Sequence, residues 1–466
     1  MDWMVSGGRT MKFTGVTAAL ICALPAWGQI RLSEVVSRAA SYDAGIEAAK
    51  EKTAQAALGI LTARTAYRPT GNAVGQVNRA TRNNVFGMLL PNGGYAPISG
   101  PPLAANAGTN VWGSLVGFLV SWEPVDFGQR AARLKTAEAE MEAAAKAEQE
   151  RQFAARASAA DAYLCVLAAD AAKKSAEASL ERARKVEEMT RALAKAGLKP
   201  ESDWARARAE KAAAETQVVE AERAARLARV AVTEWVGGDW SAMNPSAEWA
   251  AKPAPALEPG ADAKMASLPH PLIAARQALV QTALAREKAA SLAWRPRFEL
   301  QSALYARGTG ANADGTTGGG ASGLGPNVYN WALGFTATFP LFEGPRLKAE
   351  REIEQRRIRE GRAGVRKAEQ ELTAQAERAR AALDAAVKLR GIAPEQTGAA
   401  RANFEQSRAR YQAGLATLVE LADAQRTLAQ AEIDEALAGL AVWRAQLALA
   451  VARGDLNPFL EMAGER

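Results

Sequence analysis

The chain has 466 residues, a formal net charge of +7 and 48% hydrophobic residues, many of them alanine. Beyond the N-terminal segment no stretch is an unbroken apolar run of the length that crosses a bilayer, which argues against a protein built from transmembrane helices. The charges alternate in sign along helical stretches, a pattern typical of solvated helix faces rather than of a nucleic-acid-binding patch.

The N-terminal segment has the features of an export signal. Lys12 supplies the positive start, an apolar run follows it, and residues 26–28 form a small-x-small cleavage site. We therefore expect residues 1–28 to be removed. Whether translation begins at Met1 or Met11 stays open.

The two cysteines are expected to differ in environment. Cys22 lies in the export signal and follows Ile21, whereas lipoprotein signals have a small residue before the cysteine, so lipid attachment is not expected. Cys165 lies in the apolar run 162–167 and is predicted to be a core thiol. Once the signal is removed, Cys165 has no cysteine partner for an intrachain disulfide.

The first half of the chain alternates between helical and extended patterns. Residues 30–67 are alanine-rich and helical in period, and the following segments 70–81 and 111–122 alternate as strands do. Residues 129–195 contain no proline and predict one helix about 100 Å long at 1.5 Å per residue. A returning helix is predicted over 200–236.

The second half repeats this order after a helix that ends at Pro296. The expected elements are two strands and two long helices, at 297–307, 328–341, 346–412 and 418–453. Gly391 and Pro394 are expected to bend or break the first of these helices.

Two pairs of landmarks indicate a tandem duplication. Ala-Gly-Leu occurs at 196–198 and again at 413–415, and Pro-x-x-x-Gly occurs at 124–128 and again at 340–344, at nearly the same offset. The predicted organisation is a signal, two repeats, a linker between them and a tail, at 1–28, 29–236, 237–270, 271–453 and 454–466.

Three stretches, together with the repeated order of elements, resemble the TolC family of outer-membrane efflux proteins. They are Trp-Glu-Pro-Val-Asp-Phe-Gly-Gln-Arg at 122–130, Phe-Pro-Leu-Phe-Glu-Gly at 339–344, and Tyr-Gln-Ala-Gly-Leu at 411–415 leading to 421–428. The resemblance covers essentially the whole chain after the signal.

The resemblance implies a mainly α fold with a membrane β-barrel. Four strands cannot close a barrel, and open edges are not tolerated in lipid, so the family's homotrimer, with twelve pooled strands, meets that objection. The helices would form an α-barrel through the periplasm of a Gram-negative bacterium, with the linker and short elements forming a belt at its equator.

The implied function is a passive exit duct of the outer membrane, without enzymatic activity, cofactor, metal or nucleic-acid partner. It would serve a tripartite efflux or type I secretion system, coupled through a periplasmic adaptor to an inner-membrane pump of RND or ABC type. The sequence leaves the cargo and the pump class open.

By the same resemblance, several residues are expected to form a periplasmic gate. Glu420 and Asp423 occupy the positions of the family's acidic entrance, and Asp203 is the equivalent acid in the first repeat, with Arg206 three residues on to neutralise it in part. Tyr411 matches the aromatic residue that helps to hold the closed state.

The two Ala-Gly-Leu turns are expected at the periplasmic tip. Gly197, Leu198, Gly414 and Leu415 would contact the adaptor. Family members carry a basic partner for the gate tyrosine two residues past the second glycine, and here Ala416 stands in that place.

Three alternatives compete with the duct. A periplasmic adaptor would need segments of dense β pattern, and a soluble coiled-coil scaffold without a barrel would leave the paired strands as ordinary hairpins. An enzyme fits worst, because His270 is the only histidine and lies between two prolines, and the glycine run 318–320 follows no nucleotide-binding pattern. We expect that run to be an extracellular loop.

Overall fold

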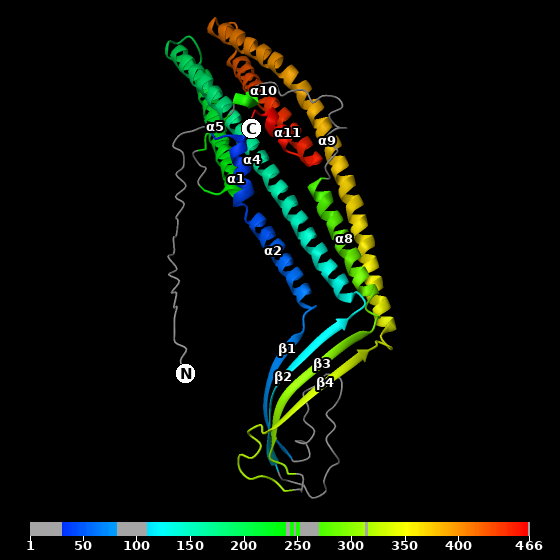
Figure 1. The fold of residues 1–466 in the computed structure, drawn as a ribbon. Coiled ribbons are helices and arrows are strands. Elements are labelled where there is room, and N and C mark those ends of the chain that lie inside the picture. The colour runs from blue at the N-terminus through cyan, green and yellow to red at the C-terminus, as the bar shows by residue number, and fades with distance from the viewer. Residues whose placement is uncertain are drawn as a thin grey trace, which may run out of the picture.

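The molecule is long and narrow, with a β-sheet at one end and helical hairpins at the other (Figure 1). This computed structural model describes residues 30–81, 110–238, 243–246, 248–251, 270–312 and 316–464. The expected signal peptide with Cys22, the connection between the first two strands and most of the expected linker lie outside the described residues.

The elements follow one another in the same order in both halves of the chain. The first half contains α1 (Leu32–Tyr42), α2 (Ala44–Thr65), β1 (Thr70–Thr81), β2 (Asn110–Val125), α4 (Gln129–Lys195) and α5 (Glu201–Val236). The second half contains α6 (Glu248–Ala251), α8 (Pro271–Ser291), β3 (Arg297–Thr309), β4 (Val328–Thr338), α9 (Gly344–Gln412), α10 (Leu418–Arg453) and α11 (Asn457–Met462).

The four strands form one antiparallel sheet in the order β1-β2-β3-β4. Gly117 of β2 lies between Val74 of β1 and Tyr305 of β3. A Cβ at Gly117 would come within 2.5 Å of the Tyr305 Cβ, so only glycine fits this position in the ladder. Strands β1 and β4 are the two edges of the sheet.

Helix α9 decides between the two outcomes expected at Gly391 and Pro394, a bend or a break. No break occurs, since α9 is a single helix of 69 residues with Pro394 inside it. Packing holds the helix together on both sides of the proline: Ala393 is buried, and Thr397 Oγ1 donates a hydrogen bond to the Ala431 carbonyl of α10 (3.1 Å). Figure 1 shows α9 curving toward the tip.

Small residues set the spacing of the long helices. On α9 buried residues recur seven positions apart at Ala379, Ala386, Ala393 and Ala400, and again from Phe404 to Tyr411. A seven-residue repeat keeps one seam facing a partner helix, and alanine lets the two backbones approach closely. Helix α9 therefore packs along α10, as α4 packs along α5.

The largest hydrophobic core lies halfway along the helices, where α1, α6 and α11 pack on α4 and α10. Trp443 of α10 meets Trp249 of α6 and Phe459 of α11 edge to face, with ring centroids 4.8 and 6.2 Å away. The hydroxyl of Tyr163 on α4 lies 2.8 Å from the carbonyl oxygen of Ile30. We call α1, α6 and α11 the belt.

One described helix, α10, is long and apolar enough to cross a membrane by length and composition, although the sequence had indicated no such segment. Half of its most apolar 18-residue window is buried inside the protein. Most of its large apolar side chains are buried, among them Leu421, Leu440 and Leu449, so much of the hydropathy of α10 comes from its place in the helical core.

Candidate functional site: the helical tip, the sheet and their junction

The two Ala-Gly-Leu turns have the same geometry. Gly197 and Gly414 both adopt left-handed backbone conformations, with φ of +71° and +77°. After Gly414, the Leu415 amide donates to the Arg410 carbonyl (2.8 Å), and the equivalent bond follows Gly197. This is the hydrogen-bond pattern that ends a helix at a left-handed glycine. Each turn places an exposed leucine at the tip, since Leu198 and Leu415 are 70% and 71% exposed.

Tyr411 joins the two halves of the chain at the tip. Its side chain is fully buried, and its hydroxyl donates a hydrogen bond to Asp203 Oδ2 of α5 (3.0 Å). The Lys199 ammonium lies 4.7 Å from the ring centroid. Burial, and then the hydrogen bond to Asp203 and its negative charge, raise the pKa of Tyr411 well above its usual value.

This contact gives Asp203 a partner that the sequence did not suggest. Within the described ranges its side chain forms no ion pair with Arg206, and it accepts a hydrogen bond from the Tyr411 hydroxyl. The sequence has Ala416 at the position where family members carry a basic partner for the tyrosine. In the structure Lys199, from the first half of the chain, supplies a cation beside the Tyr411 ring. Sequence spacing within the second half could not reveal this contact.

The start of α10 separates an apolar back from an acidic front. Leu418, Leu421 and Leu428 are buried, as the helical spacing predicted. On the exposed side, Glu420 accepts from the amide (3.3 Å) and hydroxyl (3.1 Å) of Thr417, while the Thr417 hydroxyl accepts from the Glu420 amide. Glu420 is therefore both an exposed carboxylate and half of a capping box. Asp423 is exposed one turn further on.

A hollow of about 850 Å³ lies between the two tip turns. Lys199, Asp203 and Arg206 line it from the first half of the chain, and Leu415 and Glu420 from the second. The structure thus brings all the sequence-predicted gate and tip residues to one end of the molecule.

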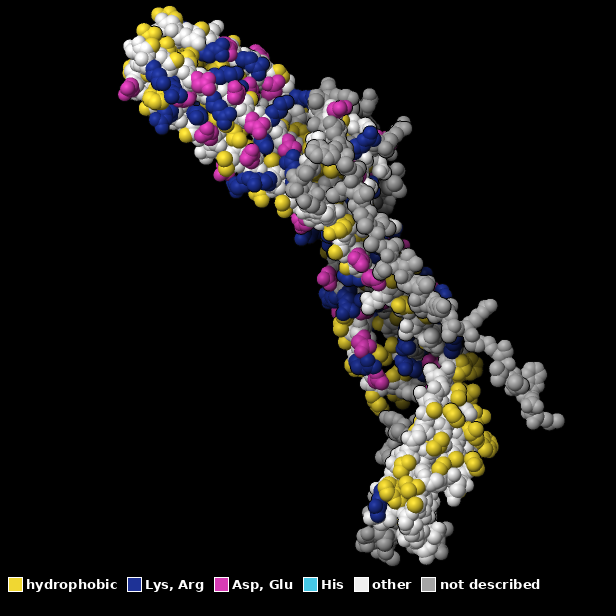
Figure 2. Space-filling view, turned by 90° about the vertical axis from the view of Figure 1, so that its left-hand side faces the viewer, with side chains coloured by type: hydrophobic (Ala, Val, Ile, Leu, Met, Phe, Trp, Pro, Cys, Tyr) yellow, Lys and Arg dark blue, Asp and Glu magenta, His cyan; other side chains and the backbone are white. Residues whose placement is uncertain are grey.

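The sheet at the opposite end has one apolar and one polar face. Phe118, Leu304 and Trp331 are neighbours across β2, β3 and β4, and they are 63%, 63% and 78% exposed. The next row, Gly117, Tyr305 and Asn330, points to the other face, because side chains alternate along a strand. Figure 2 shows apolar side chains gathered over the sheet, whereas charged side chains are spread along the helices.

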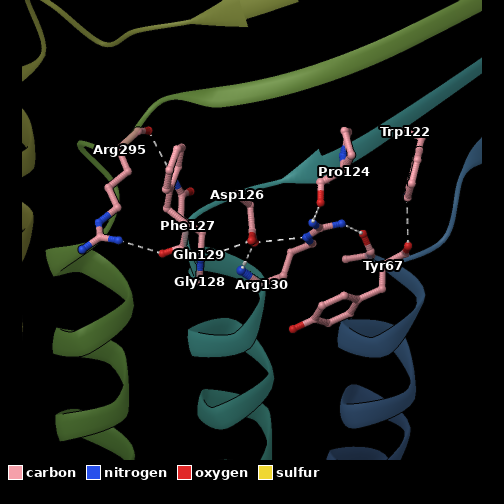
Figure 3. A network of polar contacts seen from close by, with 10 residues as sticks. Tyr67, Trp122, Pro124, Asp126, Phe127, Gly128, Gln129, Arg130 and Arg295 are labelled. Carbon is pink, nitrogen blue, oxygen red and sulfur yellow. Dashed lines mark hydrogen bonds and ion pairs between the residues drawn. The ribbon is translucent and has the colours of Figure 1, made fainter.

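Arg130 fastens the sheet to the helices (Figure 3). Its buried guanidinium pairs with Asp126 (Nε–Oδ2 3.1 Å), reaches the carbonyls of Ala66 (3.3 Å) and Pro124 (3.5 Å), and lies 4.9 Å from the centroid of the Tyr67 ring. Burial alone would raise the pKa of Asp126, but hydrogen bonds from Arg130 and the Gly128 amide outweigh it and hold the pKa below its usual range.

The same junction binds the second half of the chain. The Gln129 side-chain amide donates to the Arg295 carbonyl (3.2 Å), and the Arg295 guanidinium donates to the Phe127 carbonyl (3.0 Å), as Figure 3 shows. Phe127 and Gly128 both have positive φ, which turns the chain sharply from β2 into α4. The stretch quoted above for the family resemblance thus forms the joint between sheet and helices, a role that its sequence did not reveal.

Replacing Arg130 with alanine is expected to destabilise the protein by about 3–5 kcal/mol, because it leaves the Asp126 carboxylate buried without its partner. Thermal unfolding of the detergent-extracted protein, followed by circular dichroism, measures the effect. Arg133→Ala is the matched control, since Arg133 is exposed on the same helix. Equal melting of the two variants would contradict a stabilising role for this network. Because the pKa of Asp126 is lower in the folded protein, the charged carboxylate contributes its full stabilisation at neutral pH. This stabilisation is lost as the pH falls through the lowered pKa.

Histidine, cysteine and acidic side chains do not gather into a metal site in the part of the chain that the structure describes. No group of three or more His, Cys, Asp or Glu side chains there could hold a metal ion. His270 has a structural role: its Nδ1 accepts from the Leu272 amide (3.1 Å) at the start of α8, and its Nε2 lies 3.0 Å from the Val451 carbonyl of α10.

Solved outer-membrane channels share the fold of this chain. OprN matches at 20% identity with a TM-score of 0.71 over 91% of this chain and 89% of its own. CmeC of Campylobacter jejuni matches at 15% and 0.73 over 91% and 85%. The open state of MtrE of Neisseria gonorrhoeae matches at 20% and 0.68 over 91% and 89%.

The family follows from the sequence. The profile of the outer membrane efflux protein family matches residues 105–238 and 264–455, which is more than half of the chain. The chain therefore belongs to that family, and it is an efflux duct of the outer membrane rather than a periplasmic adaptor or scaffold. Its relatives are channels and not enzymes. No curated protein sequence matches the chain.

Proposed function

We propose that three copies of the chain assemble into a passive duct, with a twelve-stranded barrel in the outer membrane and a helical tunnel through the periplasm. The observation that carries this proposal is the four-stranded sheet, whose edges β1 and β4 are unpaired within the described residues and whose exposed face is apolar. Lipid offers no hydrogen bonds to a free edge, so such a sheet has to be closed by further strands. Pairing β4 of one copy with β1 of the next would close it and turn the polar face inward.

The belt would then surround the tunnel at its equator, and the glycine run 318–320 would lie in a loop on the extracellular side. The tip would face the inner membrane, where a periplasmic adaptor connects the duct to an RND or ABC pump that supplies the energy. The two halves of the chain, with boundaries near 29–236 and 271–453, would each contribute one helical hairpin to the tip.

At the tip, Glu420 and Asp423 of three copies would bring six carboxylates to the entrance and favour cations there. Two observations support this assignment: both side chains are exposed, and the buried leucines of α10 fix which way they point. The hydrogen bond between Tyr411 and Asp203 would hold the two hairpins of each copy together in a closed entrance.

The test of the duct is single-channel conductance of the purified, detergent-extracted protein in a planar bilayer, together with its mass in detergent. We expect a trimer that gives small, cation-selective currents. A monomer without conductance would contradict the proposal, and the apolar face of the sheet would then need another partner.

The exposed leucines of the tip are expected to contribute to adaptor docking. In the proposed assembly Leu198→Asp with Leu415→Asp is expected to reduce the amount of periplasmic adaptor crosslinked to the duct in cells several-fold, because each carboxylate would have to lose water in an apolar contact. The duct itself should still conduct. Methionine at both positions keeps an apolar tip and is the control. Capture of as much adaptor by the aspartate variant as by the methionine variant would contradict the assignment.

A further inference from the structure

A groove of about 760 Å³ lies at the level of the belt, where α5, α4, α10 and α9 run next to one another. Its floor consists of side chains of α4 and α10, most of them small or apolar, among them Cys165, Leu447 and Ala448. Trp235 of α5 and Ala379 of α9 form its two walls. Volumes of this size are typical of sites for small organic molecules.

The groove opens on the face of the helical layer that is turned away from the belt. Tyr163 of α4 points into the belt, where its hydroxyl meets the Ile30 carbonyl. Asp161 and Cys165, each two residues away, are rotated by about 200° around the helix axis, and both line the groove. In the duct proposed above the belt is on the outside, so the groove faces the lumen; this step rests on that proposed function.

The charges around the groove leave a net positive rim. Asp161 and Arg444 form an ion pair across the floor (3.0 Å) and neutralise each other. Arg378 of α9 also lines the groove, is exposed, and has no ion pair within the described part of the chain. The neighbouring Gln375 adds a neutral amide that can donate hydrogen bonds.

We propose that this groove is a binding station inside the duct for amphipathic organic anions of drug-like size. The apolar body of the molecule lies on the floor between Trp235 and Ala448, and its anionic group binds the Arg378 guanidinium, which suits carboxylates, sulfonates and phosphates because it can donate two parallel hydrogen bonds. Cargo that passes the entrance is thereby held at the equator before it moves outward.

Cys165 provides a reporter for this proposal, because its free thiol is half-buried on the floor of the groove. Burial, with the Asp161 carboxylate adding to it, raises the pKa of the Cys165 thiol, so labelling with a maleimide is done at alkaline pH. The assembled full chain is labelled with and without 1-anilinonaphthalene-8-sulfonate, and Cys165→Ser gives the blank. We expect the sulfonate to slow labelling several-fold, and the uncharged N-phenyl-1-naphthylamine to slow it much less.

Two variants separate a charge-specific site from general adsorption. Arg378→Gln is expected to raise the sulfonate concentration needed for half-protection about tenfold, the usual worth of a charge-assisted hydrogen bond. Arg362→Gln removes an exposed arginine of the same helix outside the groove and should leave that concentration unchanged. Absence of protection by the sulfonate, equal effects of the two substitutions, or failure of the maleimide to reach Cys165 in the assembled protein would each overturn the proposal.

The direction of the groove is tested on the same protein. Attaching a maleimide-polyethylene glycol to Cys165 is expected to lower the single-channel conductance, because the polymer would enter the lumen. Full conductance after complete labelling would refute the lumenal site while leaving the duct intact. A protein that never conducts, even unlabelled, would refute the duct function itself, whereas the protection experiment would still report on the groove.

Discussion

A protein carrying Glu420→Gln and Asp423→Asn is expected to form a channel that has lost most of its preference for cations. Both carboxylates are exposed near the start of α10, and three copies would place six of them around one entrance. Attraction to the carboxylates raises the occupancy of the entrance by cations, about tenfold for every 1.4 kcal/mol. Removing six charges from a narrow opening should therefore reduce the selectivity for cations over anions several-fold. Reversal potentials in a salt gradient measure the change, and blockade by multivalent cations should weaken with it.

The choice of substitution matters because Glu420 has a second role. Its carboxylate completes a capping box with Thr417, and alanine would remove that cap together with the charge. Glutamine can fill the same place in a capping box, so the amide pair changes charge while keeping the helix start. Asp384→Asn with Glu395→Gln removes the same two kinds of charge from exposed positions of α9. Equal losses of selectivity in the two double variants would exclude a local entrance at Glu420 and Asp423.

The elements of the fold could be predicted from the sequence because each is governed by local rules. Alternating side chains marked the strands, and β1 begins and ends at the expected residues, whereas β2 runs on to Val125. The Ala-Gly-Leu stretches marked the tip turns, since only glycine adopts their left-handed conformation readily. The apolar stripe of α10 is buried as its spacing predicted.

The contacts between distant segments could not be predicted in this way. The hydrogen bond of Tyr411 with Asp203 joins residues 208 positions apart, and the pairing of Asp203 with Arg206 was expected only because they are close in sequence. Arg130 reaches a carbonyl of α2's end and a carboxylate of its own turn, which no pattern within 122–130 specifies. Pro394 breaks isolated helices, but packing against α10 outweighs that tendency in α9.

Substituting Tyr411 with phenylalanine is expected to make the resting channel leak. The change removes only the hydroxyl that donates to Asp203, and the ring can stay buried beside Lys199. A hydrogen bond to a charged group contributes about 1.5–3 kcal/mol, so its loss should raise the ratio of open to closed channels about ten- to hundredfold at 1.4 kcal/mol per tenfold. Spontaneous opening in planar bilayers measures this ratio.

A double-mutant cycle decides whether the bond itself is responsible. If Tyr411 and Asp203 act only through each other, Tyr411→Phe combined with Asp203→Ala should open the channel no more than either change alone; fully additive effects would show that the two residues act separately.

The pH dependence gives an independent check. Because the pKa of Tyr411 is raised above its ordinary value of 10, the phenol keeps its proton and the bond is complete at every pH below that value, and it is lost only as the pH rises through the higher pKa. The wild-type channel should therefore stay closed between about pH 7 and pH 9, and opening in that range would mean that a group other than Tyr411 holds the entrance shut.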